Sequence, residues 1–270
     1  MRKVLIMGFA MAVVAGCGGR AGAPEASAET AGTAVKGYQS PAGVSYYVRP
    51  SGYTNALRPG GDLELEFFCF NRGTTDLDAP GVYAASRITL VTPGGKEVEP
   101  SLQPLGIWDG PSVIVPDQSH ATWISVAGIF GELEPGDYVI RWEVDGGEVR
   151  RPIHVLDGAD YYLYRLAHDT CHNEWGMHIY GEDGYMHSGL GRDAMQECGD
   201  FLIPGLEELV RDKTEIFIEG SEDATIADMY AWRVCDFAAI LLVEIEVLPS
   251  EKLRARTPEE RDEYIDDMKM

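Results

Sequence analysis

The residues best suited to chemistry are four imidazoles and a thiol that lie within one short stretch of the chain. They are His168, Cys171, His172, His178 and His187. Imidazole nitrogen and thiolate sulfur are the ligands that zinc and copper prefer in proteins. The stretch is therefore a candidate zinc site, although nothing else in the sequence gives a reason to expect a cofactor.

A β-hairpin in this stretch would bring two of the histidines together. The glycines and acids at 181–184 are typical of a turn. If Glu182-Asp183 forms the tip, His178 faces His187 with Cβ atoms ~4.5–5.5 Å apart, close enough to share an ion. A tip one residue later places His187 opposite Tyr180 and separates the pair. Exposed histidines on a hairpin surface are thus the alternative to a metal site.

The sequence contains none of the local motifs that most often mark a catalytic centre. H-E-x-x-H, G-x-S-x-G and the P-loop are all missing. Acidic pairs such as Glu182-Asp183 and Glu207-Glu208 are frequent, but adjacency alone does not place two carboxylates in one cleft. We therefore assign no catalytic residue and favour a binding protein over an enzyme.

The first residues have the three parts of an export signal. A basic start, Met1-Arg2-Lys3, precedes an apolar run over 4–14, and small residues lead to Cys17. The run is too short for a bilayer, which needs ~20 apolar residues. The ending Val14-Ala15-Gly16-Cys17 resembles the lipobox of bacterial lipoproteins, in which the cysteine is diacylated and becomes the mature N-terminus. Ordinary signal cleavage beside an incidental cysteine is the alternative.

The lipobox resemblance implies a location and a first partner. Residues 1–16 would be the signal peptide, and lipidated Cys17 would hold the protein in a membrane of the bacterial cell envelope. Gly18 stands where some bacteria place an aspartate for inner-membrane retention, so we expect the outer membrane.

Four cysteines follow Cys17, and an even number in an exported chain permits two disulfides. Cys171 and Cys198 lie in loop-like sequence, whereas Cys69 lies in a strand-like segment and Cys235 in an apolar helix-like one. We predict a disulfide between Cys171 and Cys198. In the entropic model it would stabilise the fold by ~3–4 kcal/mol.

The chain is strongly acidic, with a formal net charge of −22. Proteins that bind nucleic acid carry a basic surface, so this class of partner is excluded. Residues 158–250 hold 19 acidic and 5 basic side chains, and 41–157 hold 16 and 8. Such a field attracts cations and basic partners, or it serves solubility alone.

Composition divides the rest of the chain. Residues 17–42 are small and polar and form a flexible linker behind the lipid. Apolar and polar residues alternate over 63–67 and 138–144, the period of half-buried strands. Gly146-Gly147 separates the second of these from 148–155 and predicts a hairpin. We expect a β-sandwich.

Three turn-and-strand segments characterise this β region: Arg58-Pro59-Gly60-Gly61-Asp62-Leu63, Phe70-Asn71-Arg72-Gly73 and Glu134-Pro135-Gly136-Asp137-Tyr138. Through them, residues 43–157 resemble the Ig-like domains common in exported bacterial proteins. The resemblance implies a domain that binds, spaces or presents. Only one cysteine, Cys69, lies here, so the intersheet disulfide of antibody domains is excluded.

Residues 158–250 have a mainly helical pattern. The segment 161–167 fits a helix turn or a strand, and 201–213 carries a helical apolar stripe. A helix from about Thr225 to Ile245 is apolar apart from a few charges, so we expect it to be buried. Arg233 and Asp236, three residues apart on it, are predicted to form a buried pair.

Two helical segments, Phe201–Asp212 and Arg233–Leu242, look like parts of consecutive HEAT-like repeats. The resemblance covers barely one repeat unit, so it implies a helix pair used for protein interaction. The charged tail over 251–270 begins like a capped helix at Thr257-Pro258, and we expect it to fray because few apolar residues support it.

The sequence thus predicts a multidomain β plus α protein: an N-terminal Ig-like β-sandwich followed by a small, mainly helical HEAT-like domain with a β-hairpin. We expect a lipid-anchored envelope protein that binds a protein or a surface polymer, or serves as a scaffold, without catalysis. The alternative is a metal-binding protein or metal-dependent hydrolase that uses the cluster from His168 to His187. A purely structural lipoprotein is a third interpretation.

Overall fold

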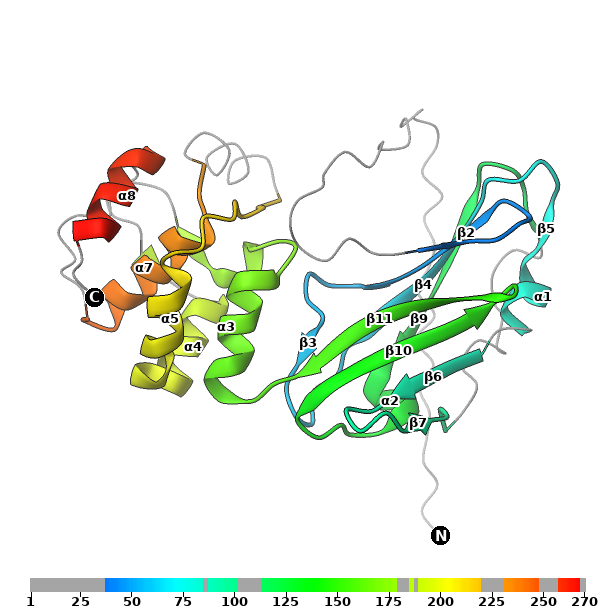
Figure 1. The fold of residues 1–270 in the computed structure, drawn as a ribbon, viewed down its shortest axis with the longest axis horizontal. Helices are drawn as coiled ribbons and strands as arrows, with labels where there is room; N and C mark the ends of the chain where they lie inside the picture. The colour runs from blue at the N-terminus through cyan, green and yellow to red at the C-terminus, as the bar shows by residue number, and fades with distance from the viewer. Residues whose placement is uncertain are drawn as a thin grey trace, which may run out of the picture. The chain divides into compact units, whose positions relative to one another are not determined.

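Figure 1 shows the protein as a computed structural model, which describes residues 37–84, 87–101, 113–178, 185–186, 189–219, 231–247 and 257–267. All of them belong to one compact unit, Ala31–Met270. The predicted signal peptide, Cys17 and the linker up to residue 36 lie outside the described residues. None of the helices in the described part of the chain is long and apolar enough to cross a bilayer.

The first sheet has four antiparallel strands in the order β1-β2-β4-β9. Their bounds are β1 Tyr38–Gln39, β2 Val44–Pro50, β4 Glu64–Asn71 and β9 Ser119–Ser125. The predicted strand over 63–67 lies largely within β4, where Leu65 and Phe67 are fully buried. Because side chains alternate along a strand, one face of this sheet is turned to the core and the other is turned away from it.

The second sheet has five strands in the order β3-β11-β10-β6-β7. Their bounds are β3 Ala56–Leu57, β6 Arg87–Val91, β7 Glu97–Val98, β10 Gly136–Val144 and β11 Gly147–Val155. The predicted hairpin is confirmed, but its turn is Asp145-Gly146, one residue earlier than expected, because Val144 pairs with Gly147. Both turn residues have positive φ, 46° and 76°, which suits the twist of the paired strands.

The two sheets share one hydrophobic core centred on aromatic rings. Trp142 of β10 meets Tyr46 of β2 and Phe67 of β4 edge-on, with ring centroids 5.5 and 5.2 Å apart. All three side chains are fully buried, and rings of this size contribute the most area per residue to a core. Four short elements complete this part: β5 Leu77–Asp78, α1 Ala79–Ala84, β8 Val113–Ile114 and α2 Val126–Phe130.

From Gly158 onward the described chain is mainly helical (Figure 1). Its helices are α3 Gly158–His168, α4 Gly189–Cys198, α5 Ile203–Leu209, α7 Val234–Glu244 and α8 Pro258–Asp267, with 3₁₀ turns at Asn173–Trp175 and Gly199–Leu202. Two short strands, β12 Met177–His178 and β13 Tyr185–Met186, form an antiparallel pair. These helices surround a second core that, as far as the chain is described, shares no residue with the first.

Segment 161–167, which fitted a helix turn or a strand, belongs to helix α3. The Asp157 side chain accepts a hydrogen bond from Gly158 N at 2.8 Å and caps the helix start. Tyr162 and Leu166, four residues apart, are buried on one face. The helix predicted over 201–213 is found as a 3₁₀ turn followed by α5.

Helix α7 is the buried centre that the sequence predicted, but its described start is different. The expected start near Thr225 lies outside the described residues, and the described residues 231–233 are not helical. Arg233 is extended, and its backbone N–H donates to the Asp236 carboxylate at 3.0 Å, which caps the helix. Every residue from Val234 to Leu242 is buried.

The predicted pair of Arg233 and Asp236 is confirmed and has a third member. Asp236 is fully buried and lies 3.0 Å from Arg233 Nη2 and 2.9 Å from Arg261 Nε. Arg261 comes from α8 and is only 2% exposed, and Ile265 of the same helix joins the second core. The expectation that the tail frays is therefore wrong, because a buried ion pair and an apolar side chain hold α8.

Candidate functional site

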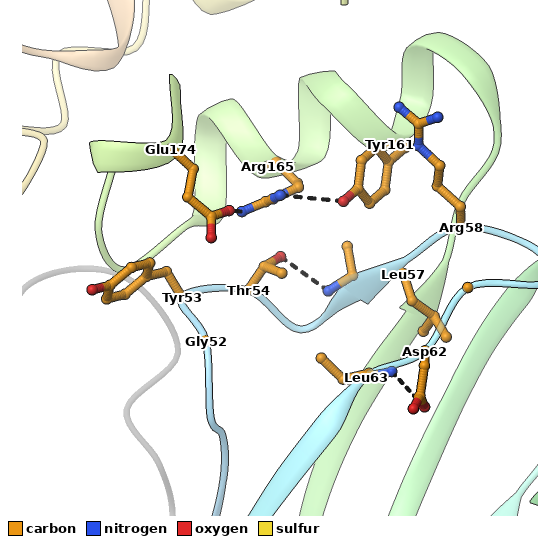
Figure 2. Close-up of a pocket in the computed structure, with 12 residues that line it drawn as sticks. Gly52, Tyr53, Thr54, Leu57, Arg58, Asp62, Leu63, Tyr161, Arg165 and Glu174 are labelled. Atoms are coloured by element: carbon orange, nitrogen blue, oxygen red, sulfur yellow. Dashed lines mark hydrogen bonds and ion pairs between the residues drawn. The ribbon is translucent and has the colours of Figure 1, made fainter. Parts of the chain in front are cut away.

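A pocket of about 310 Å³ opens between the chain around β3 and helix α3 (Figure 2). Its lining combines two tyrosines, four charged side chains and several small or apolar residues. These residues are Gly52, Tyr53, Thr54, Ala56, Leu57, Arg58, Gly61, Asp62, Leu63, Tyr161, Arg165 and Glu174. The volume falls at the small end of the range for ligand pockets.

Short turns fix the strand side of the pocket. Thr54 Oγ1 accepts a hydrogen bond from Ala56 N at 3.0 Å at the start of β3. After β3 the chain reverses through Gly60, whose φ of 71° favours glycine, and Gly61 N donates to Arg58 O at 2.9 Å. This reversal delivers Asp62 to the edge of the pocket.

Asp62 is held as an acceptor by its neighbours in sequence and in space. Its carboxylate accepts from Leu63 N at 2.8 Å, from Ala127 N at 2.9 Å and from the Ser125 hydroxyl at 2.6 Å. Burial alone would raise the pKa of Asp62, but these hydrogen bonds favour the charged form and leave it below its ordinary value. Asp62 is therefore a fixed anion and a poor proton donor.

The helix side of the pocket is organised by Arg165, whose side chain is only 5% exposed. Its guanidinium donates to Asp169 Oδ2 at 2.9 Å, to Glu174 Oε2 at 2.6 Å and to the Tyr161 hydroxyl at 3.2 Å. Figure 2 shows it lying between Glu174 and Tyr161. Burial opposes the charge, yet the two carboxylates hold the pKa of Arg165 above its ordinary value. Burial raises the pKa of Asp169 to about 6, against the pull of Arg165.

Arg58 joins the strand side to the helix side. Its guanidinium carbon lies 4.9 Å from the ring centroid of Tyr161 and 4.8 Å from that of Tyr162, and it also contacts the Tyr162 hydroxyl. The same group lies 2.8 Å from Glu197 of α4. Stacking on two rings and pairing with a carboxylate hold a flexible side chain in one place.

Tyr53 closes the other end of the pocket. Its carbonyl oxygen accepts from Thr170 N at 2.8 Å, and its hydroxyl donates to Glu219 at 3.0 Å. Nearby, Arg151 Nε donates to Asn55 Oδ1 at 2.8 Å. The pocket therefore has walls fixed by hydrogen bonds on both sides.

The charged groups of the pocket are satisfied by other groups of the protein. Each charged side chain of the pocket, namely Arg58, Asp62, Arg165 and Glu174, already bonds to another protein group. The lining offers tyrosine rings, hydroxyl groups and carboxylate oxygens beside an apolar floor. It includes no cysteine, serine or histidine, and its groups able to exchange protons are the carboxylates of Asp62 and Glu174 and the hydroxyls of Tyr53 and Tyr161.

The histidines singled out from the sequence do not form one cluster in the described structure. His168 is exposed at the end of α3, with its ring 4.6 Å from that of Tyr164. His172 is only 4% exposed, and its Nε2 lies 3.0 Å from Leu166 O, which makes this nitrogen the donor and the imidazole part of the second core. The burial of Cys171 and His172 therefore fits a packing role for both residues.

The expected pairing of His178 with His187 is wrong, because the strand register differs. His178 pairs with Tyr185 and Met177 with Met186, which is a third register beside the two that the sequence left open. His187 itself lies outside the described residues. Within the described residues, no group of three or more histidine, cysteine or acidic side chains is placed to hold a metal ion.

The structure has free thiols where the sequence predicted a disulfide. Cys171 and Cys198 are both buried and unpaired with another cysteine, as are Cys69 and Cys235. Cys171 Sγ donates to Asn173 Oδ1 at 2.9 Å within its own loop. Cys198 ends α4 and packs into the second core. Burial thus accounts for both thiols without a bond between them.

Sequence reasoning did not identify the pocket residues. The sequence pattern from Arg58 to Leu63 predicts only a turn and strand of a β domain. The segment that contains Tyr161 and Arg165 fits either a helix turn or a strand. The two stretches are about a hundred residues apart, so no local spacing links them. The one available signal was the cluster of Tyr161, Tyr162 and Tyr164 beside Arg165.

Comparison with known proteins gives little further information. No protein-family model and no curated protein matches this chain. Among solved structures, the β-glucosidase from Listeria innocua in complex with gluconolactone matches with a TM-score of 0.25 and 9% sequence identity. The match covers 42% of this chain and 16% of that enzyme. A likeness at this level supports no inference about fold or function.

Proposed function

We propose that this chain is a lipid-anchored protein of the bacterial cell envelope that binds a partner without catalysing a reaction. The anchor would be Cys17, the membrane the outer one, and the partner a protein or a surface polymer. The proposal adds an Ig-like domain over 43–157 and a HEAT-like helix pair beyond it. An antiparallel sheet and a mainly antiparallel one around a shared aromatic core support the first. Helices α5 and α7, which contribute to one helical core, support the second.

The observation that carries the binding role is the pocket in Figure 2. Its charged side chains are held by hydrogen bonds, so a ligand meets fixed donors and acceptors with little entropy left to lose. Tyr53 and Tyr161 add apolar surface with a polar tip. A pocket built in this way favours recognition, because the carboxylates of Asp62 and Glu174 are each engaged by other protein groups.

The pocket can be tested with a variant that fills it. Gly52 lines the pocket and a Cβ there would meet nothing within 4 Å, so Gly52→Phe adds a ring at the pocket wall at small steric cost. Soluble fragments released by digestion of envelope sacculi are the probe. At ten times Kd, binding stabilises the folded protein by about 1.4 kcal/mol and raises Tm by ~3–6 °C.

We expect this Tm shift for the wild-type protein and its loss in Gly52→Phe. Gly94→Phe in the β6–β7 turn is the matched control, since Gly94 is also exposed and lies away from the pocket lining. Mass spectrometry of the fragments after incubation should show them unchanged. Cleaved fragments would overturn the non-catalytic role, and an equal Tm shift in Gly52→Phe would overturn the pocket as the binding site.

The anchor is tested separately by Cys17→Ser. The wild-type protein should sediment with membranes and carry acyl groups on its N-terminal peptide, and the variant should be released. Sedimentation of the variant together with an unacylated wild-type peptide would remove the lipid anchor from the proposal.

A further inference from the structure

The face of the four-stranded sheet that is turned away from the core carries a row of aromatic side chains. Trp123 on β9 is 54% exposed, the largest exposed fraction of any tryptophan in the described residues. Tyr47 and Phe68 pair across β2 and β4, and their ring centroids lie 6.2 Å apart. We call Trp123, Phe68 and Tyr47 the aromatic row.

These rings lie on the outer face because their neighbours in the strands fill the core. Tyr46 and Val48 flank Tyr47 in β2, and Phe67 precedes Phe68 in β4, and all three are fully buried. Since side chains alternate along a strand, the aromatic row points the opposite way. The aromatic row therefore belongs to the outer face of the sheet and is separate from the core.

A polar pair lies within the aromatic row. Arg49 and Glu66 are paired across β2 and β4, and Glu66 is paired in turn with Trp123 across β4 and β9. Arg49 Nε contacts Glu66 Oε2, and the Arg49 guanidinium lies 5.6 Å from the Phe68 ring centroid. The Arg49 side chain is 57% exposed, so its remaining donors reach outward.

One end of the row is closed by the chain itself. A Cβ at Gly37 would collide with the Tyr47 ring, so the backbone there already lies against that ring. The open part therefore runs from Phe68 to Trp123, with the pair of Arg49 and Glu66 beside it. Adjacent strands are ~4.8 Å apart, so the line from Arg49 on β2 through Glu66 on β4 to Trp123 on β9 is about 10 Å long.

We infer that this face binds a neutral polysaccharide, with Trp123 as the stacking residue and Arg49, held in place by the buried Glu66, as the hydrogen-bonding group. A sugar ring has an apolar face of C–H groups and an edge of hydroxyl groups. The first packs on an exposed indole, and the second accepts hydrogen bonds from a guanidinium. The inference names one polymer class for a second site and does not depend on the pocket.

Charge and area decide between polysaccharide and other partners. The net charge of −22 repels anionic polymers, and the Arg49–Glu66 pair leaves this site without net charge to attract a basic one. Trp123 is about half exposed, and Tyr47 and Phe68 are half-buried, so the apolar area offered is well below the ~800 Å² per partner of a stable protein interface. A neutral polyol needs neither net charge nor a large apolar area.

The test is native affinity electrophoresis of the full chain in gels that contain hydroxyethyl cellulose, xyloglucan, galactomannan or dextran, with alginate as the anionic comparison. We expect at least one neutral polymer to retard the wild-type protein. Trp123→Ala should weaken that retardation at least about tenfold, and Trp123→Phe should keep most of it. Because Trp123 is exposed, both variants should fold, which circular dichroism verifies.

Phe201→Ala is the matched control, because Phe201 is an aromatic side chain 83% exposed in the helical part. It should migrate like the wild-type protein in every gel. Retardation by none of the four neutral polymers, by alginate alone, or equally in Trp123→Ala would overturn the inference, as would Trp123-dependent binding of a protein alone. Gly52→Phe should bind the polysaccharide normally, so failure of the pocket and failure of this site are distinguishable.

Discussion

In the five-stranded sheet, oppositely charged side chains meet on an exposed face. Arg141 lies 2.8 Å from Glu97 and 3.0 Å from Glu143, and both carboxylates are more than 40% exposed. In the helical part, Arg233 and Asp236 meet at 3.0 Å with 8% and 0% of their side chains exposed. The contact distances are nearly equal, and the surroundings are opposite.

The difference shows that burial, more than distance, sets the energetic role of an ion pair. On the sheet, water solvates the carboxylates, and in a pair such as Arg87–Glu99, where both side chains are about half exposed, the contribution is ~0–1 kcal/mol. Around Asp236, water is excluded, so removal of its charge leaves two buried guanidinium groups with fewer partners, Arg233 keeping only Asp262 at 2.9 Å among the carboxylates of the described residues. The exposed pairs keep the sheet soluble, and the buried group fixes how α7 and α8 meet.

Asp236→Asn should have the largest effect in this comparison. It removes the negative charge between Arg233 and Arg261 while keeping the size of the side chain. We expect the free energy of unfolding to fall by about 3–5 kcal/mol, measured by urea denaturation. A loss below 1 kcal/mol would mean that the buried group behaves like a surface pair and would break the comparison.

His172 should make the stability of the helical part depend on pH. Burial lowers the pKa of His172, and nearby Arg165 adds to that effect. The unfolded chain therefore takes up the proton first, so this contribution is fully present above about pH 6.5 and is lost as pH falls below it. One proton limits the slope to about 1.4 kcal/mol per pH unit.

The measurement is the free energy of unfolding of the wild-type protein and of His172→Gln between pH 5 and 8. The wild-type value should fall relative to the variant as the pH is lowered. Asp169, whose pKa is raised to about 6, is common to both proteins and contributes with the opposite sign, so the difference isolates His172. Parallel curves would show that the imidazole is not held neutral by the fold.

Glu99→Gln should have the smallest effect and is the surface match to Asp236→Asn. It neutralises a carboxylate that pairs with Arg87, and both side chains are about half exposed. We expect a change in the free energy of unfolding of no more than about 1 kcal/mol, and a smaller one at high salt. A loss near that of Asp236→Asn would show that the sheet also depends on its charges.

Much of the architecture followed from sequence because local patterns specify local elements. Alternation around Leu65 and Trp142 predicted strands that the structure contains, and the apolar run through Phe237 predicted the buried helix. Boundaries were less accurate. The β10–β11 turn is one residue earlier than predicted, because the pairing of Val144 with Gly147 leaves Asp145-Gly146 as the turn. Helix α7 starts at Val234 because Asp236 caps it there.

The functional surfaces were much less predictable. The pocket joins Tyr53 and Arg58 to Tyr161 and Arg165, and the aromatic row takes one residue from each of three strands. The residues of each surface come from separate segments of the chain, so no rule based on sequence spacing reveals them. The histidines, by contrast, are close in sequence, yet His172 turns into the core while His168 is exposed.

The sequence by itself determined the acidic character of the chain, the change from strands to helices near residue 158, and the pairing of Arg233 with Asp236. Each depends on composition, on a period of two or 3.6 residues, or on neighbours within one helical turn. Only the tertiary structure decided that Arg261 joins Asp236, that His178 pairs with Tyr185, and that Trp123 lies beside Glu66. These contacts arise when distant segments pack to bury apolar surface, and the register and packing of whole elements set them.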